Sequence, residues 1–395
     1  MPLLKKVILL IDKSGALGRG LLKGIARYSQ LHGHWLVFDE QTFCFSKNSA
    51  ASPIREIRNF GADGIIMPRS TIKEDILALG LPCIISELRV QMPSIPYERV
   101  GSFNILGDDL AAGKMAAEHF LDRGFKNFAF CGHDRVFWSE ERASGFTKRI
   151  EQAGFTTSIY NQPATRRRPN SRQKQQRVLS QWLNSLPKPA AVMACNDEHA
   201  RIVLNLCKTA GISVPYEIAV LGVDNDELLC SLANPALSSV ALNTERAGYQ
   251  AAELLDRLMS YETIPYKDII VQPTIVVQRL STDTIAIAEP EVKKAVKFIT
   301  DNATRAISVR DVVESTGPSR REMERRFRKF LGITIHKQIR KARAGQIAKM
   351  LAETNLTVSE IAILLGFNGV EHIARYFKKE YGINPTQYRK RYCGK

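Results

Sequence analysis

The sequence predicts a parallel α/β domain of about 280 residues followed by an all-α domain of about 110 residues with two helix-turn-helix units. Three observations lead to this prediction. Short apolar runs alternate with amphipathic helical stretches up to residue 280, only helical patterns follow residue 290, and most of the excess positive charge lies in that last segment. A chain of 395 residues is long enough for two or three domains.

The composition is that of an ordinary globular protein, with 44% hydrophobic and 24% charged residues. We expect no membrane-spanning helix, because the sequence lacks an apolar run of about 18 residues. The apolar stretch Val7–Ile11 is too short for a secretion signal and is closed by Asp12 and Lys13. We therefore interpret it as a buried first strand.

The cysteines and histidines show no recognisable ligand spacing. The seven cysteines are widely spaced without a CxxC motif, and the seven histidines form no cluster along the sequence. This pattern favours reduced thiols in a cytoplasmic protein over a disulfide framework. We expect no bound metal and no cofactor.

Positive charge is unevenly distributed along the chain. Residues 286–395 contain 23 Lys and Arg against 11 Asp and Glu, a net charge of +12, whereas the residues before them carry only +4. A solvated basic surface without a partner explains the charge alone equally well. The alternative is a polyanion such as DNA, because lysine and arginine that neutralise phosphates release counterions.

The first 280 residues follow the strand–helix alternation of a doubly wound fold. The expected strands are residues 7–11, 64–67, 83–86, 128–132, 157–160, 191–194 and 219–223, and the expected helices are residues 20–32, 53–60, 109–123, 141–153, 178–185 and 198–210. The strand segments lack polar alternation, as strands covered on both faces do. Parallel sheets of this kind place ligands at the carboxyl ends of the strands.

Two segments interrupt this organisation. Ser281–Glu291 is rich in small residues, and we assign residues 281–290 to an interdomain linker. The stretch Arg166–Arg177 is strongly basic, but it lies between an expected strand and an expected helix. We therefore expect an exposed loop there in preference to a second nucleic-acid site.

The last hundred residues repeat one helical pattern twice. Ser308–Asp311 and Ser319–Glu322 have the spacing of capping boxes, in which a hydroxyl and a carboxylate satisfy amide groups at a helix start. Gly317-Pro318 separates the two helices that they open. The side chains expected to face the core of this first unit are Val309, Val312, Val313, Met323, Phe327, Phe330 and Leu331.

The pattern returns 49 residues later, where Thr357–Glu360 and Asn368–Glu371 are the expected caps on either side of a turn at Gly366-Phe367. One long helix, residues 335–353, is expected between the units. The side chains expected inward in the second unit are Val358, Ile361, Leu364, Leu365, Ile373, Phe377 and Tyr381. A pair of short helices joined by a glycine turn can place its second helix in a major groove.

These residues resemble the AraC/XylS-type DNA-binding domain over about residues 290–392. The most specific match is Leu356-x-x-x-x-Ile361-Ala-x-x-x-Gly366-Phe367, followed by Arg375-x-Phe377-Lys-Lys and Gly382-x-x-Pro385-x-x-Tyr388-Arg389. The resemblance implies binding to double-stranded DNA. The side chains that it and the polar face of the helix assign to DNA are Arg320, Arg321, Glu324, Arg325, Glu371, His372 and Arg375.

Arginine can bond guanine O6 and N7 together, and glutamate can accept from cytosine N4, so these residue types suit base recognition. The alternative is that these charges only form i,i+4 pairs on helix surfaces. That alternative accounts for about half of the individual residues by residue type. It leaves the repeated pattern unexplained.

The N-terminal part resembles the LacI/GalR effector domain over residues 5–280. The motifs that carry the resemblance are Ala116-Ala-Glu-His119, Gly124-Phe125, Arg142-Ala-Ser-Gly145-Phe146, Ala194-Cys-Asn196-Asp197, Val220-Leu-Gly-Val-Asp224-Asn225, Leu237-Ser-Ser-Val240 and Gly248–Leu255. The resemblance implies a periplasmic-binding-protein-like sensor with two lobes, each built on a doubly wound parallel sheet. The first lobe would comprise about residues 5–124 and 243–262, and the second about residues 126–240 and 264–280.

By motif position, the resemblance assigns Asp108, Arg142, Asn196 and Asp224 to the ligand cleft, and it implies a monosaccharide effector. Carboxylates accept hydrogen bonds from the hydroxyl groups of a polyol, and arginine and asparagine can bind the other oxygens. Two further candidates are Trp138, which could stack on a sugar ring, and Arg19, which follows the first strand.

Each candidate also has a structural explanation. Asp108, Asn196 and Asp224 are residue types that often serve in turns and helix caps. Arg142 could form an ion pair on its own helix, and Trp138 could pack in the core.

Together the two resemblances imply a sugar-responsive transcription regulator that binds DNA as a homodimer. It would recruit RNA polymerase and activate the catabolic genes for a pentose such as xylose. A repressor or dual regulator for another polyol is the alternative. A doubly wound enzyme is disfavoured, because GxGxxG after the first strand, GxxxxGK[ST] and GxSxG are all missing, and we assign no catalytic residue. An exported transport receptor is disfavoured by the basic helical domain.

Overall fold

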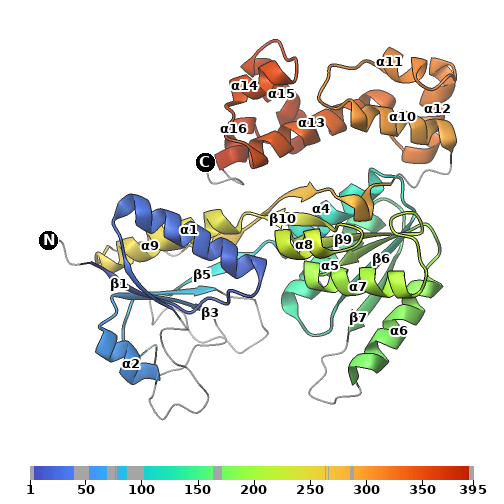
Figure 1. The fold of residues 1–395 in the computed structure, drawn as a ribbon. Coiled ribbons are helices and arrows are strands. Elements are labelled where there is room, and N and C mark those ends of the chain that lie inside the picture. Colours follow the sequence, from blue (N-terminus) through green and yellow to red (C-terminus); the bar gives the residue numbers. More distant parts are fainter. Residues whose placement is uncertain are drawn as a thin grey trace. The chain divides into compact units, whose positions relative to one another are not determined.

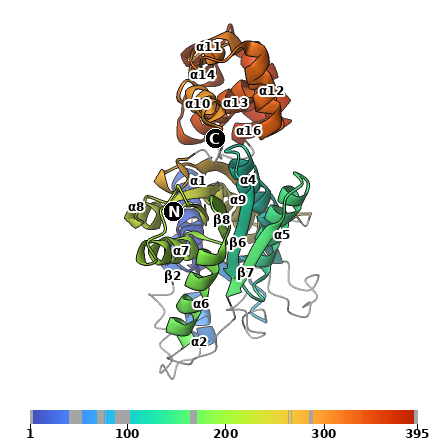
Figure 2. The same cartoon turned by 90° about the vertical axis from the view of Figure 1, so that its right-hand side faces the viewer.

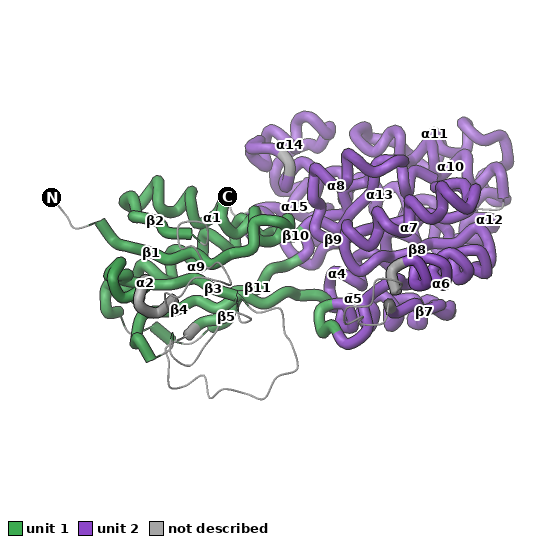
Figure 3. The backbone as a smooth tube through the Cα atoms, turned by 60° about the horizontal axis from the view of Figure 1, so that its bottom comes forward, with its two compact units in different colours: residues 1–109, 136–138, 242–272 green, residues 110–135, 139–241, 273–395 purple. Residues whose placement is uncertain are grey.

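A computed structural model describes residues 4–39, 53–68, 76, 78–86, 102–162, 171–262, 264–265, 267–284 and 289–390. The chain forms two compact units, shown in Figure 3. The first comprises residues 1–109, 136–138 and 242–272, and the second comprises residues 110–135, 139–241 and 273–395. Parts of the expected linker (285–288) and of the expected basic loop (166–170) lie outside the described residues.

The first unit is built on a six-stranded parallel sheet (Figure 1). Its strands are, in spatial order, β11 (Ile269–Val271), β5 (Ser102–Gly107), β4 (Cys83–Ser86), β3 (Gly64–Pro68), β1 (Lys6–Leu9) and β2 (Leu36–Asp39). Its described helices include α1 (Ala16–His32), α2 (Pro53–Phe60) and α9 (Thr244–Met259).

Both faces of this sheet are apolar, because alternate residues of each strand point to opposite sides. Val7 and Leu9 pack in the cluster formed with α1 and α9, whereas Ile8 and Leu10 pack in the cluster that includes Ile57 of α2. Burial on both sides explains the continuous apolar runs in the sequence.

The second unit contains a second six-stranded sheet. Its strands are, in spatial order, β12 (Pro273–Val277), β10 (Ser238–Leu242), β9 (Ile218–Asp224), β8 (Ala190–Ala194), β6 (Asn127–His133) and β7 (Thr157–Gln162). The pairs from β10 to β7 are parallel. The described helices around it include α4 (Asp109–Leu121), α5 (Phe137–Glu151), α6 (Ser171–Ser185), α7 (Asp197–Thr209) and α8 (Glu227–Leu232).

Helices cover both faces of the second sheet, and Figure 2 shows α5 on one side and α7 on the other. Val192 and Val220 pack against residues of α6 and α7. On the opposite face, Phe146 of α5 lies 6.5 Å, between ring centroids, from both Phe128 and Phe130 of β6. The prediction of doubly wound parallel sheets is therefore confirmed.

Two segments lie in a different sheet or unit from the one expected. β11 pairs with β5 in the first sheet, although residues 264–280 had been expected in the second lobe. The amide of Asp108 extends that pairing by donating to the Val271 carbonyl at 2.8 Å. Residues 110–124, expected in the first lobe, fall in the second unit.

The C-terminal part of the second unit is all helical, as expected. Its described helices are α10 (Pro290–Asp301), α11 (Val309–Glu314), α12 (Arg320–Leu331), α13 (Ile335–Glu353), α14 (Val358–Leu364), α15 (Val370–Tyr381) and α16 (Pro385–Tyr388). The first half of α13 packs with α10, α11 and α12, and its second half packs with α14, α15 and α16 (Figure 1). The long helix predicted at residues 335–353 is thus shared by two helix-turn-helix units.

The predicted helix caps are only partly confirmed. Ser308–Asp311 and Thr357–Glu360 form complete capping boxes. Ser319 accepts a hydrogen bond from the amide of Glu322, but the Glu322 carboxylate binds arginines of its own helix instead of closing the box. The cap predicted at Asn368 is wrong, because α15 begins after Gly369 and no side chain caps it.

Two residues that were predicted to lie in the core of the second helix-turn-helix unit are exposed in the structure. Leu364 is 60% exposed, because α14 is rotated so that Ile361, Ala362 and Leu365 face inward. Tyr381 is 39% exposed, although its ring stacks on Phe377 with centroids 4.5 Å apart. The other expected core positions of the two units are buried or pack against the buried clusters.

None of the helices in the described part of the chain combines the length and the apolar character needed to cross a bilayer.

Candidate effector site and DNA-binding surface

Three of the six ligand-site candidates meet at the carboxyl end of the second sheet. Arg142, on α5, is only 6% exposed. Its Nη1 donates to the Cys195 carbonyl at 2.6 Å, and its Nη2 lies 3.3 Å from Asp224 Oδ1. Asn196 follows Cys195 at the end of β8, beside this pair. These three residues, assigned by motif position, thus lie at the strand ends where parallel sheets place ligands.

The backbone at Asp224 adopts a conformation that side-chain-bearing residues rarely take. Its φ is +102°, and that of Asn225 is +49°. The turn is held by the Asn225 amide, which donates to Ser239 Oγ at 3.0 Å, and by Arg279, whose Nη2 donates to Asn225 Oδ1 at 2.9 Å. Strain that the surroundings maintain in this way is typical of functional positions.

The structural explanation for Asn196 is confirmed, because its Oδ1 accepts from the His199 amide at 2.9 Å and caps α7. Sequence reasoning missed the next residue, Asp197. Its buried carboxylate accepts from the Asp226 amide at 2.7 Å and from Ser239 Oγ at 2.6 Å. Burial, together with the Asp224 charge, raises the pKa of Asp197 to about 7.

The other three candidates, Arg19, Asp108 and Trp138, belong to the first unit. Arg19 lies on α1, and its Nη1 donates to the carbonyls of Lys13 and Ser14 in the preceding loop. Asp108 directly follows β5, and Trp138 lies half-buried in the first turn of α5. Arg19 and Asp108 thus follow strands at their carboxyl ends, as a ligand site in a parallel sheet requires.

Glycines set the position of the helix that carries Arg142. A Cβ atom at Gly113 of α4 would lie 2.1 Å from the Arg142 carbonyl oxygen, and one at Gly145 of α5 would lie 2.1 Å from the Leu110 carbonyl oxygen. α4 and α5 therefore approach each other more closely than a pair of alanines would permit. This contact gives a physical reason for the glycine in the Arg142-Ala-Ser-Gly145 motif.

The structure also brings together residues that showed no spacing pattern in the sequence. The ligand atoms of His133, Cys195 and His199 all lie within 4.8 Å of one another. The sequence had predicted no metal cluster. Its histidines and cysteines looked scattered, because adjacency here arises only when β6 and β8 pair.

The second candidate surface lies on α12 and α15, the second helices of the two helix-turn-helix units. Six of the seven DNA-binding candidates are exposed, namely Arg320, Arg321, Arg325, Glu371, His372 and Arg375. Glu324 differs, because it is half-buried and one of its oxygens is buried without a hydrogen-bond partner in the described structure. Glu324 is therefore less accessible to a base than the six exposed candidates are.

Ion pairs with carboxylates orient the candidate Arg325 and its neighbour Arg326 on α12. Arg325 donates to the two oxygens of Glu322 at 2.8 and 2.7 Å. Arg326 donates to Glu322 at 2.7 Å and also pairs with Glu289. These arginines lower the pKa of Glu322 to about 2, so the pairs persist throughout the physiological pH range.

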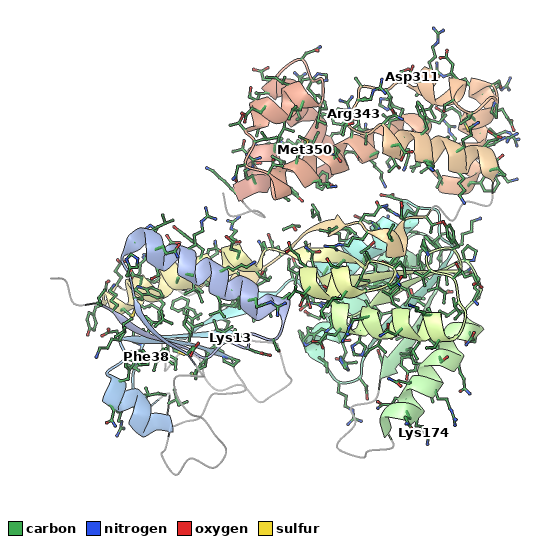
Figure 4. All side chains as sticks on the ribbon, in the orientation of Figure 1. Lys13, Phe38, Lys174, Asp311, Arg343 and Met350 are labelled. Atoms are coloured by element: carbon green, nitrogen blue, oxygen red, sulfur yellow. The ribbon has the colours of Figure 1, made fainter. Side chains whose placement is uncertain are left out.

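A buried arginine that sequence reasoning missed holds the second unit together. Arg343, labelled in Figure 4, extends from α13 and donates through Nη2 to the Leu365 carbonyl at 2.6 Å. Its guanidinium lies 4.5 Å from the centroid of the Phe367 ring. The turn between α14 and α15 is thus fixed to the long helix by a charge-assisted hydrogen bond and a cation–π contact.

Comparisons with known proteins agree with this division of the chain. Residues 117–282 match a periplasmic binding protein-like domain, and residues 312–391 match a helix-turn-helix domain. The xylose operon regulatory protein of Escherichia coli (strain K12) is 30% identical over 394 residues, which cover 97% of this chain and 96% of that protein. The chain belongs to the xylose operon regulatory protein family.

Two further relatives of this family support the assignment. The xylose operon regulatory protein of Haemophilus influenzae is 29% identical, covering 97% of this chain and 98% of that protein. A solved structure titled as the xylose-binding transcription activator xylR matches with a TM-score of 0.57 and 28% identity, covering 98% of this chain and 97% of that one. The chain is therefore a transcription regulator with a periplasmic-binding-protein-like domain and a DNA-binding helix-turn-helix domain.

In this member of the family, the helical domain and the second sheet share contacts within one compact unit. The Tyr388 hydroxyl of α16 donates to the Thr274 carbonyl of β12. Lys341 of α13 lies 2.6 Å, Nζ to Oδ1, from Asp122 just after α4. These contacts connect the helices that carry the DNA-binding surface to the sheet that carries Asp224.

Proposed function

We propose that this chain activates transcription of sugar-catabolic genes when a monosaccharide binds its N-terminal domain, and that D-xylose is the first candidate. The observation that carries the proposal is the Arg142–Asp224 pair at the carboxyl end of the second sheet, in a chain that also carries a helix-turn-helix domain. The names of the relatives, which refer to the xylose operon and to xylose binding, support the choice of sugar.

The site chemistry suits a polyol. The Asp224 carboxylate can accept hydrogen bonds from two adjacent hydroxyl groups while Arg142 donates one to a third oxygen. Asn196 offers an amide beside them. The further ligand contacts that we propose from the sequence are Asp108 as an acceptor, Trp138 as an apolar ring surface and Arg19 as a donor.

The mechanism that we propose is a shift between two states of the sensor. The sugar binds more tightly to a closed arrangement of the two lobes than to an open one, and this unequal affinity is the only way a ligand can shift such an equilibrium. In a homodimer, closure would change how two DNA-binding domains meet neighbouring half-sites. The regulator would then recruit RNA polymerase.

We further propose that the protein acts in the cytoplasm and is not an enzyme. The relatives named above are regulators, which supports the second point. The basic helical domain supports the first, because it needs access to DNA.

Two measurements on the full chain test the proposal. Isothermal titration calorimetry with D-xylose, L-arabinose, D-ribose and D-glucose measures effector binding, and D-xylose is expected to bind with the lowest Kd. Duplexes selected from a random pool then give the operator, expected to show two contact blocks about 10 base pairs apart. Anisotropy with and without sugar measures the response, and a chain that binds none of the four sugars would contradict the proposal.

A further inference from the structure

Three side chains able to bind a metal meet at the carboxyl end of the second sheet, next to the Arg142–Asp224 pair. His133 ends β6, Cys195 directly follows β8, and His199 lies in the first turn of α7. We propose that these residues form a binding site for a thiophilic transition-metal ion such as Zn²⁺. Their ligand atoms lie within 4.8 Å of one another, which makes this one site contributed by two neighbouring strands and a helix.

The backbone fixes each of the three residues. The Cys195 amide donates to the Cys131 carbonyl at 2.8 Å, continuing the pairing of β8 with β6. The His133 amide donates to Ser139 Oγ at 2.9 Å, and the His199 amide donates to Asn196 Oδ1 at 2.9 Å. Only side-chain rotation is therefore needed to bring the donor atoms onto one ion.

The required rotation is small. Zinc–sulfur and zinc–nitrogen bonds of about 2.3 and 2.0 Å in a tetrahedron place ligand atoms about 3.5 Å apart. The present separations reach at most 4.8 Å. The imidazole rings of His133 and His199 already meet edge to face, with centroids 4.0 Å apart.

The donor set selects the class of ion. One thiolate and two imidazoles favour Zn²⁺ or Cu⁺ over Mg²⁺ and Ca²⁺, which prefer oxygen ligands. Burial lowers the pKa of both histidines, which favours the neutral imidazole, the form that binds metal ions.

Deprotonation of the Cys195 thiol is the unfavourable step in metal binding, because burial raises the pKa of Cys195 to about 12. A bound cation offsets this cost by replacing the thiol proton. The position of Cys195 helps in two further ways. It lies directly before the N-terminus of α7, and the nearby Arg142 guanidinium also favours the thiolate.

Three protein ligands leave one tetrahedral position for water or another small ligand. The carbonyl of Cys195 is also the acceptor for Arg142 Nη1. The metal site and the candidate effector pair therefore share one strand end. The metal proposal does not depend on the proposed function, because it is tested by metal binding alone.

The experiment uses the full chain without a polyhistidine tag, reduced and freed of metal with a chelator. Titration with Zn²⁺ by calorimetry is expected to show one site per chain. Titration with Co²⁺ is expected to produce visible bands of a tetrahedral site and a near-ultraviolet thiolate-to-cobalt charge-transfer band. The charge-transfer band reports the cysteine ligand directly.

The matched variants are Cys195→Ser, His133→Gln and His199→Gln, with Cys207→Ser and His119→Gln as controls. Cys207 and His119 are also buried in the second unit but lie outside the cluster. Cys195→Ser is expected to remove the charge-transfer band and to weaken Zn²⁺ binding by more than about 100-fold, the upper end of what second-shell changes cost. Each histidine variant is expected to weaken binding by at least about 10-fold.

Circular dichroism of each variant confirms that it is folded before it is titrated. The proposal is overturned if the wild-type chain binds no stoichiometric Zn²⁺, or if folded Cys195→Ser binds as tightly as the wild type. It is also overturned if Cys207→Ser or His119→Gln weakens binding as much as the three ligand variants do.

Discussion

Arg325 and Glu322 form a two-fold hydrogen-bonded ion pair one turn apart on α12, with donor–acceptor distances of 2.8 and 2.7 Å. The pair holds an exposed guanidinium in a defined orientation on the helix proposed to enter a major groove. An arginine presented in this way can bond guanine O6 and N7 together. The same geometry is also what an ordinary surface ion pair would show, so only base discrimination separates the two interpretations.

Arg325→Ala is expected to reduce discrimination at one base pair of the operator by about 10- to 100-fold while leaving the other positions unchanged. Anisotropy against a panel of single-base operator variants measures this. Arg310→Ala is the matched control, because Arg310 is an exposed arginine of α11 that pairs with Glu314. Equal effects of the two substitutions at every operator position would show that Arg325 reads no base.

Arg343→Ala is expected to destabilise the second helix-turn-helix unit by about 2–4 kcal/mol, because the Leu365 carbonyl loses its charged donor and Phe367 loses its cation–π partner. Urea unfolding followed by circular dichroism measures the loss. Arg328→Ala on the exposed face of α12 is the control and is expected to leave the unfolding midpoint unchanged. An unchanged midpoint for Arg343→Ala as well would contradict the structural role.

Local sequence signals predicted the fold well where one short segment decides the outcome. The capping boxes at Ser308 and Thr357 depend on residues three positions apart, and both are present. The cap at Asn368 failed, because Gly369 offers an alternative helix start that the sequence does not rank. Leu364 was misplaced, because apolar residues run from Ile361 to Leu365 and several rotations of α14 bury a similar share of them.

The candidate site was assigned through the motif positions of the LacI/GalR resemblance, and the general rule about parallel sheets agrees with it. Arg142, Asn196 and Asp224 were identified as residues at strand ends or motif positions, and the sheet brings them together. The approach of His133 to Cys195 depends on the order of β6 and β8 in the sheet. Strand order is a property of the whole fold, and no local spacing encodes it.

His119 predicts a pH dependence of stability. It is buried, its Nε2 lies 3.0 Å from Thr282 Oγ1, and burial together with the Arg123 charge lowers its pKa well below the ordinary value. The folded state thus keeps His119 neutral, whereas the unfolded state takes up a proton below about pH 6.5. Its contribution is fully present above that pH and is lost as the pH falls.

The loss is expected to approach about 1.4 kcal/mol per pH unit below 6.5. Urea unfolding of the wild type and of His119→Gln at pH 5.5 and 7.5 measures it, and the variant should show the smaller difference. The comparison with the variant removes the contribution of the other histidines. Parallel pH profiles for the two proteins would contradict the prediction.

Gly145→Ala is expected to destabilise the second unit by about 1–3 kcal/mol, because its Cβ would lie 2.1 Å from the Leu110 carbonyl oxygen. The displaced α5 would also move Arg142, so effector affinity should fall in the folded variant. Thermal unfolding and calorimetry measure the two effects. Gly345→Ala, at a position on α13 where the described residues place no atom within 4 Å of a new Cβ, should instead leave stability unchanged or raise it.

The Arg142–Asp224 pair makes the most direct prediction about the effector. Asp224→Asn keeps the size of the side chain but removes the charge, so one hydroxyl of the sugar loses its acceptor and Arg142 loses its ion pair. We expect effector affinity to fall by at least about 10-fold in calorimetry, as the loss of a hydrogen bond to a charged group implies. Affinity for the operator without sugar should remain that of the wild type, because the substituted carboxylate lies outside the helical domain.

Asp301→Asn, on α10 in the helical domain, is the matched control and should leave sugar binding unchanged. If Asp224→Asn lowers DNA affinity in the absence of sugar while sugar binding persists, Asp224 supports the fold of the second unit and does not contact the effector.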